Sequence, residues 1–119
     1  LDELAECREQ GAAMLTGADA AIVVVADPTC ADTWVEDCSI VMANMHLEAA
    51  ASGVGSCWIQ GRLRQAADGR STHEFVANLL KVPAPYQLEA ILSLGMPEAE
   101  APRRTFDEAL LGKVHWETF

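Results

Sequence analysis

Residues 53–61, GVGSCWIQG, follow a long apolar segment and decide how the chain folds. Glycine-rich stretches of this kind also occur in phosphate-binding loops, but the dinucleotide fingerprint places G-x-G-x-x-G after a strand and before a helix. Here the glycines follow a helical pattern, and Trp58 stands where the third glycine would be. The spacing therefore predicts that Gly53 ends a helix, that Gly55 lies in a turn, and that residues 56–60 form a strand.

The segment before this stretch predicts a helix over residues 34–52 that is apolar on most sides. Thr33 and Glu36 have the spacing of an S/T-x-x-E capping box at its start. A helix that is apolar all round must be buried, either at the centre of the domain or against a second subunit. Because the run Ala49–Ala51 allows helices to approach closely, the sequence favours a dimer interface.

Two more helices and two more strands complete the predicted secondary structure. Leucines and alanines at helical spacing predict an amphipathic helix over residues 1–15. The continuous run AAIVVVA, residues 20–26, predicts the central strand, covered on both faces. Residues 72–80 predict a short helix that opens with a Ser71–Glu74 capping box, and 86–95 predict a strand entering the core.

Together these elements predict a single α+β domain over residues 1–119. We expect a small mixed sheet flanked by helices on both faces, with the long helix at a dimer interface. Residues 96–119 contain Pro97, Pro102 and many charges, which predict an extended tail. Because Val114, Trp116 and Phe119 alternate like a strand in this tail, we expect its end to dock rather than to fray.

The composition of the chain disfavours several classes of binding partner. Eight Lys and Arg residues stand against 18 Asp and Glu, giving a formal charge of −10 that opposes binding to nucleic acid or anionic lipid. No run approaches the roughly 18 apolar residues that a membrane helix needs. The four cysteines, which form no C-x-x-C pair, favour a cytoplasmic protein with buried thiols and no bound metal.

Three segments carry a resemblance to a known family. They are TWVEDCSIVMANMHLEAAASGVGSCWIQG (33–61), AILSLGMPEAEAPRR (90–104) and KVHWETF (113–119). In order, spacing and residue type they resemble the C-terminal part of the nitroreductase family, the FMN-dependent NAD(P)H oxidoreductases. The resemblance extends over the whole chain but over only part of the family's domain, because members begin with a segment that helps to bind the flavin phosphate. It therefore implies an N-terminally truncated domain.

The resemblance also implies a cofactor site. Trp58, Ile59, Gln60 and Gly61 occupy the family's position beside the isoalloxazine ring, where backbone amides approach N5. A glycine at 61 then avoids crowding a flat ring and leaves an N–H free for N5. Either Arg103 or Arg104 matches the basic residue that reaches the FMN phosphate, a task that suits the guanidinium fork.

The implied activity is ping-pong electron transfer through FMN. NAD(P)H donates hydride, and a flat acceptor such as a nitroaromatic or a quinone then takes the electrons. No protein side chain is expected to be catalytic, and we interpret Cys38, Cys57 and His46 as packing residues. The resemblance further implies a homodimer with a flavin at the subunit boundary and a tail that reaches across.

Two questions stay open at this point. A second hypothesis is a non-catalytic or truncated relative that keeps the dimer scaffold without bound flavin, because the main phosphate-binding segment is missing. The sequence also does not choose between NADH and NADPH. Arg62, Arg64 and Arg70 either favour a phosphorylated nicotinamide or form a solvated mobile loop.

Overall fold

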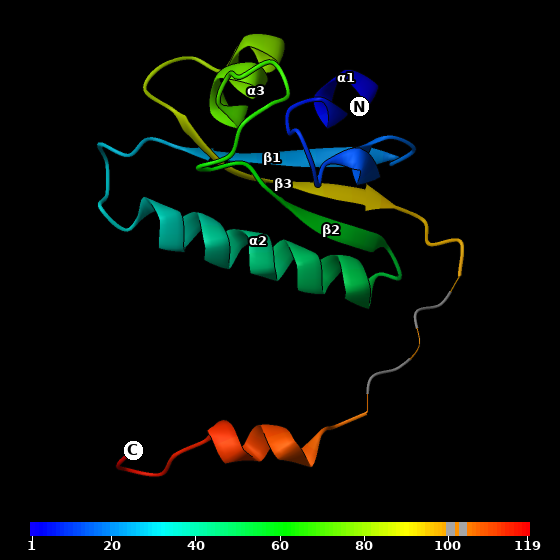
Figure 1. The fold of residues 1–119 in the computed structure, drawn as a ribbon, viewed down its shortest axis with the longest axis vertical. Coiled ribbons are helices and arrows are strands. Elements are labelled where there is room, and N and C mark those ends of the chain that lie inside the picture. Colours follow the sequence, from blue (N-terminus) through cyan, green and yellow to red (C-terminus); the bar gives the residue numbers. More distant parts are fainter. Residues whose placement is uncertain (100–101, 103–104) are drawn as a thin grey trace.

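The structure, a computed structural model, describes residues 1–99, 102 and 105–119. Its strands form one sheet with helices on both faces, so the predicted α+β class is confirmed (Figure 1). In chain order the elements are α1 (Asp2–Ala5), the 3-10 helix η1 (Ala13–Leu15), β1 (Ala20–Ala26), α2 (Trp34–Ala51), β2 (Gly55–Gln60), α3 (Thr72–Leu80), β3 (Gln87–Gly95) and the 3-10 helix η2 (Glu108–Lys113).

The sheet is built around β3, the last strand in the sequence. Its order is β1-β3-β2, and both strand pairs are antiparallel. β3 is central because it is buried on both faces, with Ile91 in one core and Leu92 in the other. The prediction that residues 20–26 form the central strand is wrong, since β1 is an edge strand of this sheet and leaves Ile22 39% exposed. A mixed sheet needs a parallel pair, and the strands in the described part of the chain form none.

A β-bulge in β3 shapes the sheet beside the end of β2. The register with β1 shifts between Val24 and Val25, which leaves Glu89 without a partner in β1. Because of this extra residue, Leu88 and Ile91 belong to the same core although they are three positions apart. The bulge thus bends the central strand at the level of Glu89.

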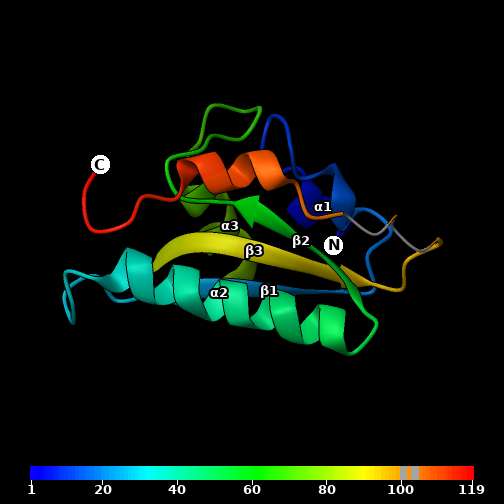
Figure 2. The same cartoon turned by 90° about the horizontal axis from the view of Figure 1, so that it is seen from below.

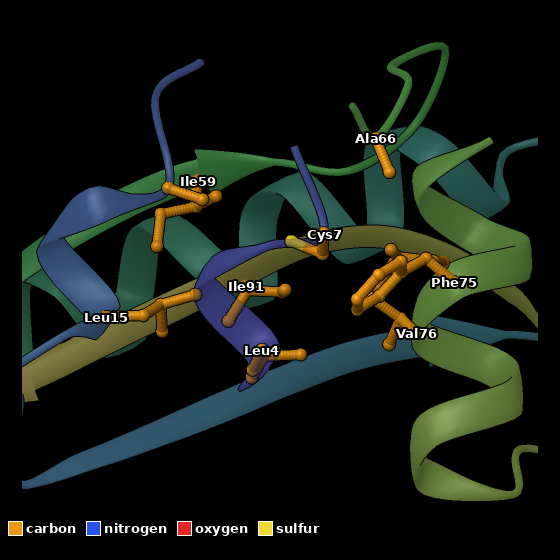
Figure 3. Close-up of a cluster of buried hydrophobic side chains, with 10 residues drawn as sticks. Leu4, Cys7, Leu15, Ile59, Ala66, Phe75, Val76 and Ile91 are labelled. Carbon is orange, nitrogen blue, oxygen red and sulfur yellow. The ribbon is translucent and has the colours of Figure 1, made fainter. Parts of the chain in front are cut away.

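Helices cover both faces of the sheet (Figures 1 and 2). Each face carries a separate apolar core. On the face under α3 and the N-terminal segment, Figure 3 shows side chains of both segments meeting over Ile91 of β3. This core consists of Leu4, Cys7, Ala12, Leu15, Ile59, Ala66, Phe75, Val76, Leu88 and Ile91. On the opposite face, Met42 of α2 packs against Ala90 and Leu92. Both cores therefore depend on β3.

The predicted helix over residues 1–15 is wrong. The chain forms only the short α1 and η1, and Gly11 between them has a φ of +85°, which a continuous right-handed helix excludes. A long-range hydrogen bond holds the broken segment against α3, because Oγ1 of the buried Thr72 donates to the carbonyl oxygen of Cys7 at 2.8 Å. Contacts with distant residues have overridden the local periodicity here.

α2 confirms the predicted helix over residues 34–52 but not its predicted capping box. Thr33 has φ −88° and ψ 14°, which is not the extended conformation of a capping residue, and its side chain does not cap the helix. Its hydroxyl instead donates to a carboxylate oxygen of Asp37 at 3.1 Å. Gly53, with φ +73°, follows the end of the helix as predicted, and Gly55 is the first residue of β2 rather than part of a turn.

α3 confirms both the predicted helix over residues 72–80 and its capping box. Ser71 is extended, with φ −62° and ψ 149°, and its Oγ accepts the N–H of Glu74 at 3.1 Å. The Glu74 carboxylate accepts the N–H of Ser71 at 2.9 Å in return. This backbone hydrogen bond holds the pKa of the Glu74 carboxyl below its ordinary value.

The last residues leave the sheet after β3 and lie apart from it (Figure 1). Part of the predicted extended tail over residues 96–119 is helical, because η2 spans Glu108–Lys113. Residues 114–119 form no strand, and the rings of His115 and Phe119 stack with centroids 4.2 Å apart. A lone strand needs a partner, and no strand of the described sheet pairs with this segment.

The two helix starts generate a matched prediction. Replacing Ser71 with Ala removes a real cap, so we expect the free energy of unfolding to fall by about 1 kcal/mol. Replacing Thr33 with Ala removes only a surface contact with Asp37, and we expect a change within about 0.5 kcal/mol. Urea denaturation followed by circular dichroism measures both, and equal losses in the two variants would contradict the assigned caps.

Candidate functional site

The C-terminal end of β2 closes against the bulge of β3. The N–H groups of Gly61 and Arg62 both donate to the carbonyl oxygen of Glu89, at 3.0 and 2.8 Å. The N–H of Gly61 is therefore used within the chain, and the expectation that it is free for a flavin N5 is wrong. Trp58, Ile59 and Gln60 are the last three residues of the edge strand β2, and Gly61 follows them at this closed end.

Gly61 is required by packing inside the chain. It is buried, and a Cβ at this position would lie 2.5 Å from Cδ2 of Leu88 and 2.7 Å from its Cγ. Contacts this short do not occur between real side chains, and Leu88 is itself fully buried in the larger core and cannot move aside easily. The expected reason for the glycine, room for a flat ring, is thus replaced by contact with a leucine of the neighbouring strand.

The free backbone donors of this stretch belong to other residues. In an antiparallel pair, successive residues direct their N–H and C=O groups to opposite sides of the strand. Since the N–H of Gly61 points at β3, the backbone groups of Gln60 and Trp58 point to the outer side of β2. No strand in the described part of the chain pairs with that side. The outer edge of β2 therefore presents backbone donors and acceptors that a planar ligand can use.

Hydrogen bonds fix the side chains along this edge. The indole N–H of Trp58 donates to Oε1 of Gln60 at 3.0 Å, and Nε2 of Gln60 donates to the carbonyl oxygen of Arg62 at 3.3 Å. Both side chains are half-buried, whereas Ile59 is fully buried on the opposite face of the sheet. Of the four predicted residues, Trp58 and Gln60 thus line the edge, while Ile59 and Gly61 support it from within the core.

A hollow adjoins this end of β2. It has a volume of about 270 Å³ and lies between Gly61, the following loop and the start of α3. The guanidinium of Arg62 lies over the ring of Trp34, 5.7 Å from its centroid, and Arg64 and His73 also line the hollow. Spacing in the sequence points to the arginines but not to His73, which comes from a different element. The predicted phosphate ligands Arg103 and Arg104 lie outside the described residues.

A buried carboxylate occupies the other side of the bulge. Glu89 is 3% exposed, and its Oε2 has no hydrogen-bond partner among the described residues. Burial raises the pKa of the nearby Cys38 thiol, and the charges of Glu89 and Asp37 raise it further. Cys38 is therefore held in the protonated form, which is a poor nucleophile. Sequence patterns did not single out Glu89, because its burial follows from the bulge.

His46 and Cys57 form no reactive pair in the structure. Nδ1 of His46 lies 2.6 Å from the hydroxyl of Ser56, which ties α2 to β2 at the surface. Cys57 is a half-buried strand residue with a free thiol. Within residues 1–99, 102 and 105–119, no three His, Cys, Asp or Glu side chains come together as a metal site, and no helix is long and apolar enough to cross a bilayer.

The architecture defines a class: an α+β unit in which a long helix and a pair of shorter ones enclose an antiparallel sheet. Neither outer strand, β1 or β2, pairs with a further strand in the part of the chain that the structure describes. The sequence profile of the nitroreductase family matches residues 3–96. The chain belongs to the nitroreductase family.

One curated relative comes from Archaeoglobus fulgidus and is provisionally named an NADH dehydrogenase/NAD(P)H nitroreductase. It is 36% identical to the chain over 91 residues, which are 73% of this chain and 49% of the relative. The chain thus spans about half the length of this relative.

Solved structures agree with the fold. An FMN-dependent nitroreductase from Clostridium difficile is 36% identical, with a TM-score of 0.90 over 100% of this chain and 69% of that one. A provisionally named NADH dehydrogenase/NAD(P)H nitroreductase from Parabacteroides distasonis is 25% identical, with a TM-score of 0.82 over 99% of this chain and 66% of that one. A nitroreductase with bound FMN from Desulfitobacterium hafniense, 21% identical and with a TM-score of 0.60, shares the fold over 88% of this chain and 54% of that one.

The packing at Gly61 generates a prediction that does not depend on any ligand. Gly61→Ala forces a methyl group into Leu88, and we expect it to lower the free energy of unfolding by about 1–3 kcal/mol. Gly112→Ala is the control, because no atom lies within 4 Å of the added Cβ. Thermal denaturation without added flavin measures both variants. If Gly61→Ala were as stable as the control, the contact with Leu88 would not be the reason for the glycine.

Proposed function

We propose that this protein is an FMN-dependent NAD(P)H oxidoreductase of the nitroreductase type. Family membership over most of the chain supports the proposal, and the bare outer edge of β2 carries it in structural terms. Relatives named for NAD(P)H and FMN support the same cofactors. We infer that nitroaromatics or quinones are reduced, since both are flat molecules able to stack on the same ring.

The residues present fit a flavin at this edge. The outward backbone groups of Trp58 and Gln60 would hold the rim of the ring, and the hydrogen bond between their side chains keeps this rim rigid. We assign the phosphate to Arg103 or Arg104, in line with the family resemblance. When bound, FMN would supply the redox chemistry by exchanging hydride with the nicotinamide and with the acceptor.

The protein's own contribution is positioning. The two hydrogen bonds to the Glu89 carbonyl anchor the end of β2, so that the outward backbone groups have a fixed direction. Trp58 and Gln60 reduce the access of water to one side of the edge, because both are half-buried and Trp58 packs against the core that contains Met42 of α2. No side chain is required as nucleophile, which agrees with the protonated state of Cys38.

We also propose that the active form is a homodimer joined through α2. Three large apolar side chains on this helix are exposed in the isolated chain: Ile40 at 60%, Val41 at 49% and Leu47 at 68%. Ile40 and Leu47 lie seven residues apart, so they share one face of the helix. A patch of this kind on a water-facing helix indicates a partner surface.

A second candidate function stays in view. A relative that keeps the dimer scaffold without flavin would have the same α2 surface and the same core. It is favoured by the hydrogen bond to Glu89 that occupies the N–H of Gly61, the donor expected to meet the flavin N5. Measurement of flavin binding separates the two functions.

Flavin binding is the direct test. We expect the protein produced from the complete gene to be yellow, to release FMN on denaturation, and to oxidise NAD(P)H in the presence of a quinone. The double variant Arg103→Gln/Arg104→Gln should bind FMN at least tenfold more weakly, because each charge-assisted bond contributes roughly 1.5–3 kcal/mol. Lys81→Gln, which removes a cation at the end of α3, is the control. A colourless protein that takes up no FMN would favour the scaffold function.

The dimer has its own test. Ile40→Glu/Leu47→Glu places two charges on the exposed face of α2, and we expect it to shift the protein from dimer to monomer in analytical ultracentrifugation. Met14→Glu is the control, since Met14 is an exposed apolar residue of η1, away from α2. A monomeric parent protein at micromolar concentration, or an unchanged dimer in the double variant, would refute the assigned interface.

A further inference from the structure

We propose that the hollow beside Gly61 binds the 2′-phosphate of NADPH and makes this protein prefer NADPH over NADH. The inference rests on the proposed oxidoreductase function and names the co-substrate of that site. It is carried by a group of cationic and hydrogen-bond-donating side chains that the flavin site itself does not use. These side chains come from the loop after β2 and from the first turn of α3.

The lining of the hollow is cationic in an acidic protein. The chain carries a formal charge of −10, yet the side chains around this hollow include two arginines and one histidine and no carboxylate. Positive charge gathered in one concave site attracts anions even when the net charge of the protein repels them. The remaining polar lining comes from Ser71 and Gln87, which are uncharged.

The two arginines are available for a ligand. Within the described residues the only ion pair in this loop joins Arg70 to Asp68, and neither Arg62 nor Arg64 has a carboxylate within ion-pair distance. Arg62 is oriented by the ring of Trp34, and Arg64 uses one N–H to reach the carbonyl oxygen of Leu63 at 3.1 Å. Their remaining N–H groups form the donor fork that suits a phosphate monoester.

His73 adds a hydrogen-bond donor to the same hollow. Its Nδ1 accepts the backbone N–H of Leu88 at 3.3 Å, so this nitrogen carries no proton. In the neutral imidazole the proton then lies on Nε2, which makes that nitrogen a donor. The hydrogen bond to β3 also fixes the position of the ring beside the arginines.

The size and position of the hollow suit one end of a larger ligand. At about 270 Å³ it is smaller than the roughly 300–1,000 Å³ of pockets that enclose a drug-sized molecule. A second hollow of about 660 Å³ shares Leu63, Arg64 and Ser71 with it and offers room for an adjoining group. Arg64 follows Gly61 by three residues, so their Cα atoms are at most about 10 Å apart. The phosphate site therefore lies near the flavin edge but outside it.

Ligand titration tests the site independently of catalysis. We use 2′,5′-ADP and 5′-AMP as probes, because they differ only in the 2′-phosphate, and titrate each into the protein from the complete gene by calorimetry. We expect 2′,5′-ADP to bind at least tenfold more tightly, and Arg64→Gln to remove most of this difference. Arg62→Gln, at the half-buried second arginine of the hollow, should act in the same direction. Arg70→Gln is the control, because Arg70 is already paired with Asp68. Equal binding of the two probes, or an equal loss in the control, would overturn the proposal.

Steady-state kinetics separates this proposal from the proposed function. In Arg64→Gln we expect the KM for NADPH to rise about tenfold, with a small change in kcat and less than a twofold change in the KM for NADH. A protein that uses NADH and NADPH equally well, before and after the substitution, would refute the phosphate site while leaving the oxidoreductase function intact. If Arg64→Gln instead weakened FMN binding without changing the preference between nicotinamides, the hollow would be the flavin phosphate site and the proposal would be wrong. A protein without flavin that still preferred 2′,5′-ADP would refute the oxidoreductase function and keep the site.

Discussion

One carbonyl oxygen organises this molecule. The bulge in β3 presents the C=O of Glu89 to the end of β2, where the N–H groups of Gly61 and Arg62 both bind it. This junction ends the edge strand and directs the loop that carries Arg62 and Arg64. It also requires a glycine at 61, because Leu88 of the larger core fills the space where a side chain would stand. The cores, the strand edge and the cationic hollow meet at this point.

The junction separates the roles of neighbouring residues. Ile59 and Gly61 face the larger core, while Trp58 and Gln60 lie on the opposite face of the sheet, where Trp58 packs against the smaller core and is tied to Gln60. Two of the four residues in this stretch thus have a structural role. The same alternation brings polar groups to one side of β2 without exposing the core on the other. Alternate positions of one strand therefore differ in role: one set packs into the larger core and keeps the strand rigid, and the other set shapes the outer edge.

Several elements that depend on local signals were predictable from the sequence, although the local Thr33–Glu36 signal did not form a cap. The Ser71–Glu74 box and the run AAIVVVA each contain the hydrogen-bonding or branching pattern that forms the element, and both formed where predicted. Elements that depend on distant residues were not. The segment over residues 1–15 has helical periodicity, but its contacts with the loop after β2 and with Thr72 break the helix.

The site shows the same division. Residues 58–61 could be located from the sequence as a strand end, yet the reason for Gly61 depends on Leu88 in another strand. Likewise, the cluster of arginines in the loop can be recognised in the sequence. His73 lies in the same hollow only because the backbone N–H of Leu88 in β3 holds its ring in place. Pairing between strands distant in sequence is what single-sequence patterns do not record.

The bare edge of β2 has a consequence for how this protein tolerates change. Its outward groups belong to the main chain, and every residue type except proline supplies the same amide. Exchanging the side chains at 58 and 60 would therefore alter the shape of the rim but leave its donors in place. Backbone donors do not depend on the identity of the side chain, so related chains can diverge at these two positions and still present the same N–H and C=O groups.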